Sequence, residues 1–143
     1  MKDVDYVVFS VPATKDVENL LHSEGGIFKS ANKGTTIIDC STIAPHASKQ
    51  FAQDAKKLSM TFVDSPMSGG IMGAQNGTLT FMVGSEKDKF EAVKQVLEGM
   101  GKNIIHCGGP GTGGIAKVSF KQNKDCDLDL QQHDFGSSDG CCF

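Results

Sequence analysis

The sequence predicts an α/β fold with a mostly parallel sheet. Short apolar runs typical of buried strands alternate with segments whose apolar residues recur every three or four positions, as on one face of a helix. Glycine, serine or proline follows several of these runs, and no internal repeat is visible. Such alternation is typical of strand–helix–strand units. At 143 residues, the chain is long enough to bury the core of one domain.

Five strands are expected. They cover residues 6–11, 35–39, 61–64, 78–83 and 103–107. The first, Tyr6–Val11, is almost continuously apolar, which is the pattern of a parallel strand covered on both faces. Pro12 ends it, because proline has no N–H for a further ladder bond.

Helices are expected between the strands. Thr14 is a candidate N-cap for a helix that ends near Leu21. Two longer helices follow over residues 45–58 and 86–99, each with an apolar stripe for the core. A last helix opens after the glycines around Gly111.

Residues 119–143 differ from the rest of the chain. They show no sustained period of 3.6 or 2, carry five aspartates, and end in a glycine- and serine-rich stretch followed by Cys-Cys-Phe. Such a segment has too few apolar residues to offset the entropy of ordering it. We expect it to be irregular and disordered, and residues 1–118 to form the folded part.

Composition excludes several classes of function. A net charge of −3 argues against nucleic-acid binding, and no apolar run reaches the ~18–20 residues of a membrane span. The four histidines lack the spacing of metal ligands, so no metal site is expected. Five cysteines, with no Cys-x-x-Cys pair, fit a reducing compartment better than a disulfide framework.

The segment Asp64-Ser-Pro-Met-Ser-Gly-Gly70 is the most informative of the chain. It follows an apolar run, and its serine and two glycines allow a ligand to approach the backbone closely. Open α/β sheets bind ligands at such strand ends. From the residues alone, a plain tight turn is the favoured interpretation.

Residues 109–114 match G-x-G-x-x-G, follow an expected strand and open a helix. A dinucleotide fingerprint must also be followed by a second strand with an acidic residue about twenty positions on. Only the aspartate-rich tail follows here. We therefore interpret this loop as the turn that opens the last helix.

Two motifs together carry a resemblance to a known family. Asp64-x-Pro-x-Ser-Gly-Gly70, followed by Gly77-x-Leu-Thr-x-Met-Val-Gly84, resembles the substrate-binding segment of the β-hydroxyacid dehydrogenases, and the likeness extends from about Asp5 to Lys117. It implies a Rossmann-like, doubly wound sheet and reversible oxidation of a small 3-hydroxy acid to its semialdehyde with NAD or NADP. Residues 1–118 would be the latter part of an NAD(P)-binding domain of the 6-phosphogluconate dehydrogenase kind.

The resemblance also implies roles for particular residues. Ser68, Gly69 and Gly70 would hold the substrate carboxylate, and Lys117 would be the general acid–base for the substrate hydroxyl. A lysine can do this where burial or a nearby positive charge lowers its pKa towards neutrality. The alternative is an ordinary solvated surface lysine. The family has an asparagine one turn later, where this chain has Lys121.

For the cofactor, the resemblance places the Val11-Pro12 loop against the dinucleotide. Asp16 stands where the family often has asparagine, and Thr42 would lie near the nicotinamide riboside. An alternative for Ser41-Thr42 is an N-cap for the helix that begins near residue 45.

Compared with the family, the chain is expected to lack the first βαβ unit, with its phosphate loop and ribose-binding residue, and the helical C-terminal domain. We therefore expect little activity from the chain alone and an uncovered edge of its sheet. The sequence does not decide between NAD and NADP as the cofactor. The resemblance implies a hydroxy-acid substrate, a dimer with a second copy or a full-length relative, and a mitochondrial location, otherwise a cytoplasmic one. Two alternatives stay open: a glyoxylate or semialdehyde reductase of the same superfamily, and a non-catalytic binding protein.

Overall fold

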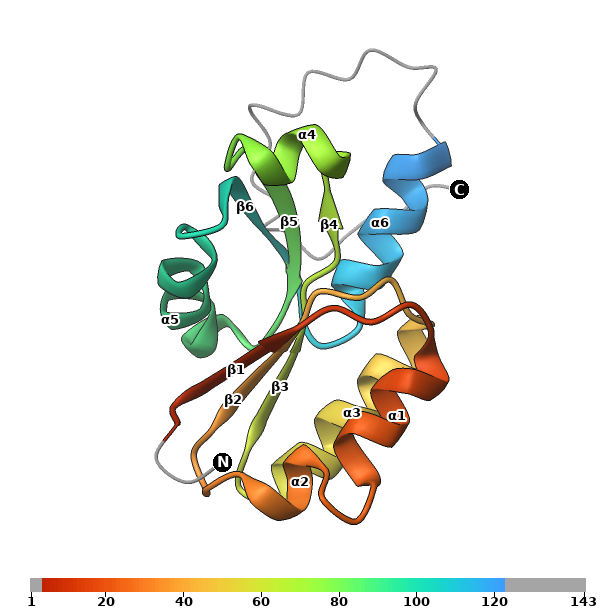
Figure 1. The fold of residues 1–143 in the computed structure, drawn as a ribbon, viewed down its shortest axis with the longest axis vertical. Coiled ribbons are helices and arrows are strands. Elements are labelled where there is room, and N and C mark those ends of the chain that lie inside the picture. The colour runs from red at the N-terminus through yellow and green to blue at the C-terminus, as the bar shows by residue number, and fades with distance from the viewer. Residues whose placement is uncertain (1–3, 123–143) are drawn as a thin grey trace.

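The computed structural model describes residues 4–122, in which strands and helices alternate (Figure 1). The strands are β1 (Tyr6–Phe9), β2 (Thr36–Asp39), β3 (Thr61–Asp64), β4 (Met67–Ser68), β5 (Leu79–Gly84) and β6 (Gly101–Gly108). The helices are α1 (Thr14–His22), α2 (Ile27–Ser30), α3 (Pro45–Lys57), α4 (Gly70–Gln75), α5 (Lys87–Leu97) and α6 (Thr112–Gln122). The short elements α2, β4 and α4 were not predicted from the sequence.

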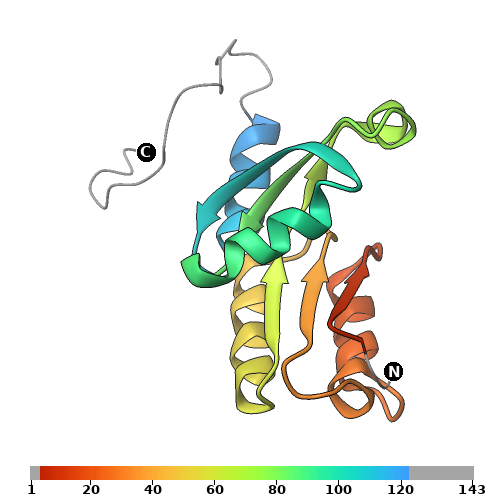
Figure 2. The same ribbon diagram turned by 90° about the vertical axis from the view of Figure 1, so that its left-hand side faces the viewer.

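The sheet is mixed and mostly parallel, which confirms the predicted fold class. Its order is β1-β2-β3-β5-β4, with β6 paired to β5. The pairs β1–β2, β2–β3 and β5–β6 are parallel, whereas β3–β5 and β4–β5 are antiparallel. The two parallel parts meet only where Asp64 of β3 pairs with Gly84 of β5. This junction lies beside the start of α6 (Figures 1 and 2).

Two apolar cores hold the helices against the sheet. The first joins α1, α2 and α3 to one face of β1–β3, with Val17, Leu21 and Phe51 packed against Ile37 and Phe62. The second joins α5 to the opposite side of the sheet. Its buried members are Ile38, Cys40, Val63, Leu79, Phe81, Val83, Val93 and Leu97. Helices α1–α3 thus cover one face of β1–β3, whereas β5 and β6 lie between α5 on one side and α6 on the other (Figure 1).

The first strand differs from its prediction. It ends at Phe9 rather than Val11, and its side chains alternate between exposed and half-buried, with Tyr6 40% and Val8 37% exposed. Among residues 4–122, β1 pairs only with β2. Helices α1–α3 lie on the face of this part of the sheet that Val7 and Phe9 contact, and Tyr6 and Val8 are on the opposite face (Figure 2). The prediction that this strand is covered on both faces is therefore wrong for the described residues.

The helix caps also differ from their predictions. Thr14 is the first residue of α1, and the N-cap is Ala13, whose N–H donates to the carboxylate of Asp16 at 3.1 Å. The N-cap of α3 is Ala44, which has no side-chain capping bond, so the Ser41-Thr42 cap is wrong. Each start has another stabilising feature: in α1 the Asp16 carboxylate bonds the N-cap N–H, and α3 begins with Pro45, whose fixed φ suits a first turn.

Helix α6 continues to Gln122, so residues 119–122 are helical rather than irregular, and the rest of the predicted tail lies outside the described residues. None of the helices within residues 4–122 is long and apolar enough to cross a membrane.

Candidate active site

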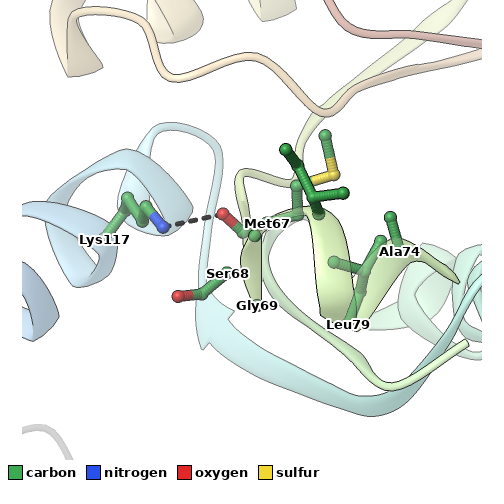
Figure 3. A pocket seen from close by; sticks show the side chains of 8 residues that line it. Met67, Ser68, Gly69, Ala74, Leu79 and Lys117 are labelled. Carbon is green, nitrogen blue, oxygen red and sulfur yellow. Dashed lines mark hydrogen bonds between the residues drawn. The ribbon is translucent and has the colours of Figure 1, made fainter. Parts of the chain in front are cut away.

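A pocket of about 880 Å³ opens between the segment around β4 and helix α6. Its lining residues are Met67, Ser68, Gly69, Gly70, Ile71, Ala74, Leu79 and Lys117. Figure 3 shows that Lys117 approaches from α6 while the other side chains come from the β4–α4–β5 segment. The structure therefore brings together all four residues that the resemblance assigned to substrate and proton.

The wall at Ser68 depends on two glycines. Met67 and Ser68 pair with Phe81 and Thr80 of β5, and the chain then turns sharply into α4. Gly69 has φ +134° and Gly70 has φ +60°, conformations that residues with a side chain rarely adopt. The turn therefore places Ser68 at the pocket, and the two residues that follow it have no side chain.

Lys117 forms the opposite wall. Its side chain is partly buried, and its Nζ donates a hydrogen bond of 2.7 Å to the carbonyl oxygen of Met67 (Figure 3). This bond links α6 to the residue immediately before Ser68, across 50 positions of sequence. The lysine is held at the pocket rather than extended into solvent, so the alternative of a surface lysine does not describe it. The side chain of Lys121 lies outside the described residues.

The glycine-rich loop before α6 binds a carboxylate of the chain itself. Asp64, at the end of β3, accepts the N–H of Gly111 at 2.6 Å and that of Gly114 at 3.0 Å. These amides are therefore not available to a dinucleotide phosphate, which confirms the interpretation of the loop as the turn that opens α6. Burial raises the pKa of Asp64, although the backbone donors oppose that rise.

The candidate cofactor residues lie outside the lining of this pocket: Val11 and Pro12 follow β1, Thr42 follows β2, and Asp16 is in the first turn of α1. The N–H of Val11 donates to the hydroxyl of Ser41 at 2.9 Å, which joins the loops that follow the two strands. Thr42, the next residue, is exposed. Asp16 is engaged in capping Ala13. Open α/β sheets bind nucleotides at these strand ends.

The sequence analysis missed one residue of this region, Asp39, and gave a second, Ser41, a different role. Ser41 is buried and holds the Val11 loop, and its N–H donates to Oδ1 of Asp39 at 2.8 Å. Asp39 is fully buried, and burial raises its pKa to about 6, with a smaller contribution from the charge of Asp64. The two aspartates are register partners on β2 and β3. The bond between Asp39 and Ser41 is a local Asx-type contact that the sequence could have suggested, whereas the contacts of Ser41 with Val11 and of Asp39 with Asp64 form only after the strands pair.

The role of Ser41 can be tested by stability. Ser41→Ala is expected to lower the free energy of unfolding by about 1–2 kcal/mol, because the N–H of Val11 loses its acceptor in a partly buried position. Thr42→Ala, a change at the exposed neighbouring residue, should alter it by less than about 0.5 kcal/mol. Denaturant unfolding of both variants measures the difference; equal effects would contradict the role of Ser41.

The alternating strands and helices, with candidate ligand residues at the strand ends, define a dinucleotide-binding domain of the α/β class. The chain belongs to the family described as the NAD binding domain of 6-phosphogluconate dehydrogenase, whose model matches residues 1–109. It is 48% identical over 117 residues to a probable mitochondrial 3-hydroxyisobutyrate dehydrogenase of Dictyostelium discoideum, covering 82% of this chain and 36% of that protein. This family assignment confirms the predicted class.

Other relatives give the same picture. A 2-hydroxy-3-oxopropionate reductase of Escherichia coli strain K12 is 44% identical over 115 residues, covering 80% of this chain and 39% of that protein. The solved structure of Mycobacterium tuberculosis 3-hydroxyisobutyrate dehydrogenase with L-serine matches with a TM-score of 0.77 and 34% identity, covering 82% of this chain and 40% of that one. The chain thus spans between a third and about two-fifths of the length of these relatives.

Proposed function

We propose that this chain is part of an NAD- or NADP-dependent dehydrogenase that oxidises a small 3-hydroxy acid, such as 3-hydroxyisobutyrate, to its semialdehyde. The observation that carries the proposal is that the Ser68-Gly69-Gly70 turn and Lys117 form two walls of one pocket. A 3-hydroxy acid presents a carboxylate at one end and a hydroxyl two carbons away. The turn would hold the carboxylate, and Lys117 would take the hydroxyl proton.

The chemistry needs a hydride acceptor, and a bound NAD or NADP would supply it. The loops after β1 and β2 suit such a cofactor because Ser41 joins them and Thr42 is exposed beside them. The loop that carries Ile43 and Pro45 also approaches Gly111 and Gly114 at the start of α6. A cofactor held on these loops would therefore lie on the side of α6 that leads to Lys117.

Substrate binding gives a direct test that does not require turnover. Adding 3-hydroxyisobutyrate to the full chain should shift the amide signals of Ser68, Gly69 and Gly70, whereas the neutral amide of the same acid should not. Lys117→Gln should weaken binding about tenfold, since the amine that would contact the substrate hydroxyl is lost from the pocket wall. The control Lys94→Gln, on α5, should leave the affinity unchanged. Equal shifts with the neutral amide would contradict carboxylate binding by the turn.

Turnover by the chain alone is expected to stay far below about 1 s⁻¹, an ordinary dehydrogenase rate. One feature of the sequence supports this expectation: Lys121 stands where the resemblance places a substrate-binding asparagine. Assays with NAD⁺ and NADP⁺ measure it. Turnover of 3-hydroxyisobutyrate near 1 s⁻¹ would refute the expectation.

The reductase alternative is favoured by the likeness to the E. coli 2-hydroxy-3-oxopropionate reductase. Rates on 3-hydroxyisobutyrate and on reduction of that oxo acid, measured side by side, separate the two activities. The non-catalytic alternative predicts association with a full-length relative and no cofactor binding.

The name of the Dictyostelium relative includes a mitochondrial location, which we extend to this chain. Imaging of the tagged chain tests that location.

A further inference from the structure

Asp64 is almost completely buried, with 2% of its surface exposed, between the end of β3 and the first turn of α6. Each carboxylate oxygen has its own partner: Oδ1 accepts the N–H of Gly111 and Oδ2 accepts that of Gly114. Hydrogen bonds to a charged acceptor are stronger than neutral ones, and two from one planar group fix orientation as well as distance. The first turn of α6 therefore has one position relative to β3.

Two glycines pack closely against this carboxylate. A Cβ on Gly113 would lie 2.8 Å from Oδ2 of Asp64, and a Cβ on Gly84 would overlap Oδ1. Both glycines thus form a cradle in which α6, β3 and β5 approach one another through the carboxylate. A side chain in this space would push α6 away from the sheet.

Lys117 lies four positions after Gly113 on the same helix, which places it one turn further along. Its Nζ bonds the carbonyl of Met67, three residues after Asp64. The short segment from Asp64 to Met67 is therefore joined to α6 at two points, at the first turn by the aspartate and one turn later by the lysine. The first attachment is buried and consists of two hydrogen bonds, whereas the second is a single hydrogen bond from the end of a flexible side chain.

We propose that Asp64 is the positioning residue for Lys117. By fixing the first turn of α6, its carboxylate sets where Nζ lies relative to the Ser68-Gly69-Gly70 turn. The functional meaning of this placement rests on the proposed role of Lys117 as the proton carrier. The two parts of the motif then have different roles. Its aspartate, Asp64, holds the helix that carries Lys117, and its serine and glycines line the pocket.

The test compares two variants of the full chain, Asp39→Asn and Asp39→Asn/Asp64→Asn. Asp39 is the matched control because it is equally buried and in register with Asp64, yet its bonds go to Ser41 and not to α6. Reductive methylation with ¹³C gives each lysine its own NMR signal while keeping its charge. The Lys117 signal is assigned by its loss in Lys117→Arg.

Adding Asp64→Asn to the Asp39→Asn chain is expected to move the Lys117 signal towards that of the exposed Lys102, leaving the other lysines in place. Amide exchange at Gly111 and Gly114 should become about tenfold faster, because an asparagine offers one acceptor and turns its NH₂ towards the second N–H. A Lys117 signal that stays in place while the protein is folded, or one that Asp39→Asn alone moves as far, would overturn the proposal.

A second variant tests the direction of the dependence and needs no change at Asp64. Lys117→Met removes the bond to Met67 and should leave exchange at Gly111 and Gly114 within about twofold of the parent chain, since the carboxylate still holds the turn. Exchange that becomes about tenfold faster would show that the lysine holds the helix, and would refute the proposal. None of these readouts uses turnover or substrate, so a failure here is distinct from a failure of Lys117 as the proton carrier.

Discussion

Gly113→Ala is expected to lower the free energy of unfolding by about 3 kcal/mol, the upper end of the usual cost of overpacking a core. The added Cβ would overlap the carbonyl oxygen of Met82 and lie 2.8 Å from Oδ2 of Asp64. Both neighbours are fixed, one in β5 and the other by its bonds to Gly111 and Gly114. Relief therefore requires moving α6 off the sheet, which also breaks the capping bonds of Asp64.

The matched control lies in the same loop. Gly109 has no atom within 4 Å of its ideal Cβ position and no positive φ, so Gly109→Ala should change stability by less than about 1 kcal/mol, in the stabilising direction. Urea unfolding of the two variants at pH 7 measures both values. Similar stabilities for the two alanine variants would show that α6 does not need its close approach to Asp64.

The parts that sequence could predict are those determined by local pattern. Val17 and Leu21 repeat at helical spacing and do bury one face of α1, and the apolar runs at Ile37 and Phe62 are buried strands. The pocket residues came from the resemblance and not from spacing. The structure adds the contact that no spacing could supply, the bond between Nζ of Lys117 and the carbonyl of Met67.

The parts that sequence could not predict depend on contacts between distant segments. Asp64 reads locally as the polar residue that ends a strand, and its partners at Gly111 and Gly114 lie about fifty positions later. Ser41 looked like a helix cap, yet its hydroxyl serves a neighbouring loop. The apolar run Tyr6–Val11 has the composition of a strand covered on both faces. Whether a face is covered depends on which elements pack against it, and composition does not show that.

The stability of the chain is expected to fall by about 2 kcal/mol between pH 4 and pH 6, and by about 3 kcal/mol over the whole range from about pH 3 to pH 8, because of Asp39 alone. Burial raises its pKa from 3.8 to about 6, so in this range the folded carboxyl keeps a proton that the unfolded one has lost. The folded state thus binds more protons, and raising the pH favours unfolding until both forms are ionised. A rise of about two pKa units corresponds to about 3 kcal/mol.

Asp39→Asn should remove that part of the slope, because the amide stays neutral throughout. At pH 7 the variant should be more stable than the parent by about 1–2 kcal/mol rather than the full 3, since Oδ2 of Asp39 has no hydrogen-bond partner among the described residues and the amide NH₂ would be equally unpaired. A residual slope of the same sign should remain, because burial also raises the pKa of Asp64.

Asp54→Asn is the control of opposite sign. The hydrogen bond from Lys57 is the largest cause that lowers the pKa of Asp54, so this carboxylate favours folding above its ordinary range and loses that effect as the pH falls. Its partner is an exposed lysine, so the effect should be small. Denaturant unfolding from pH 4 to pH 7 compares the variants. A slope that Asp39→Asn leaves unchanged would mean that the buried carboxylate is ionised in the folded state throughout, with solvent or a cation compensating its charge.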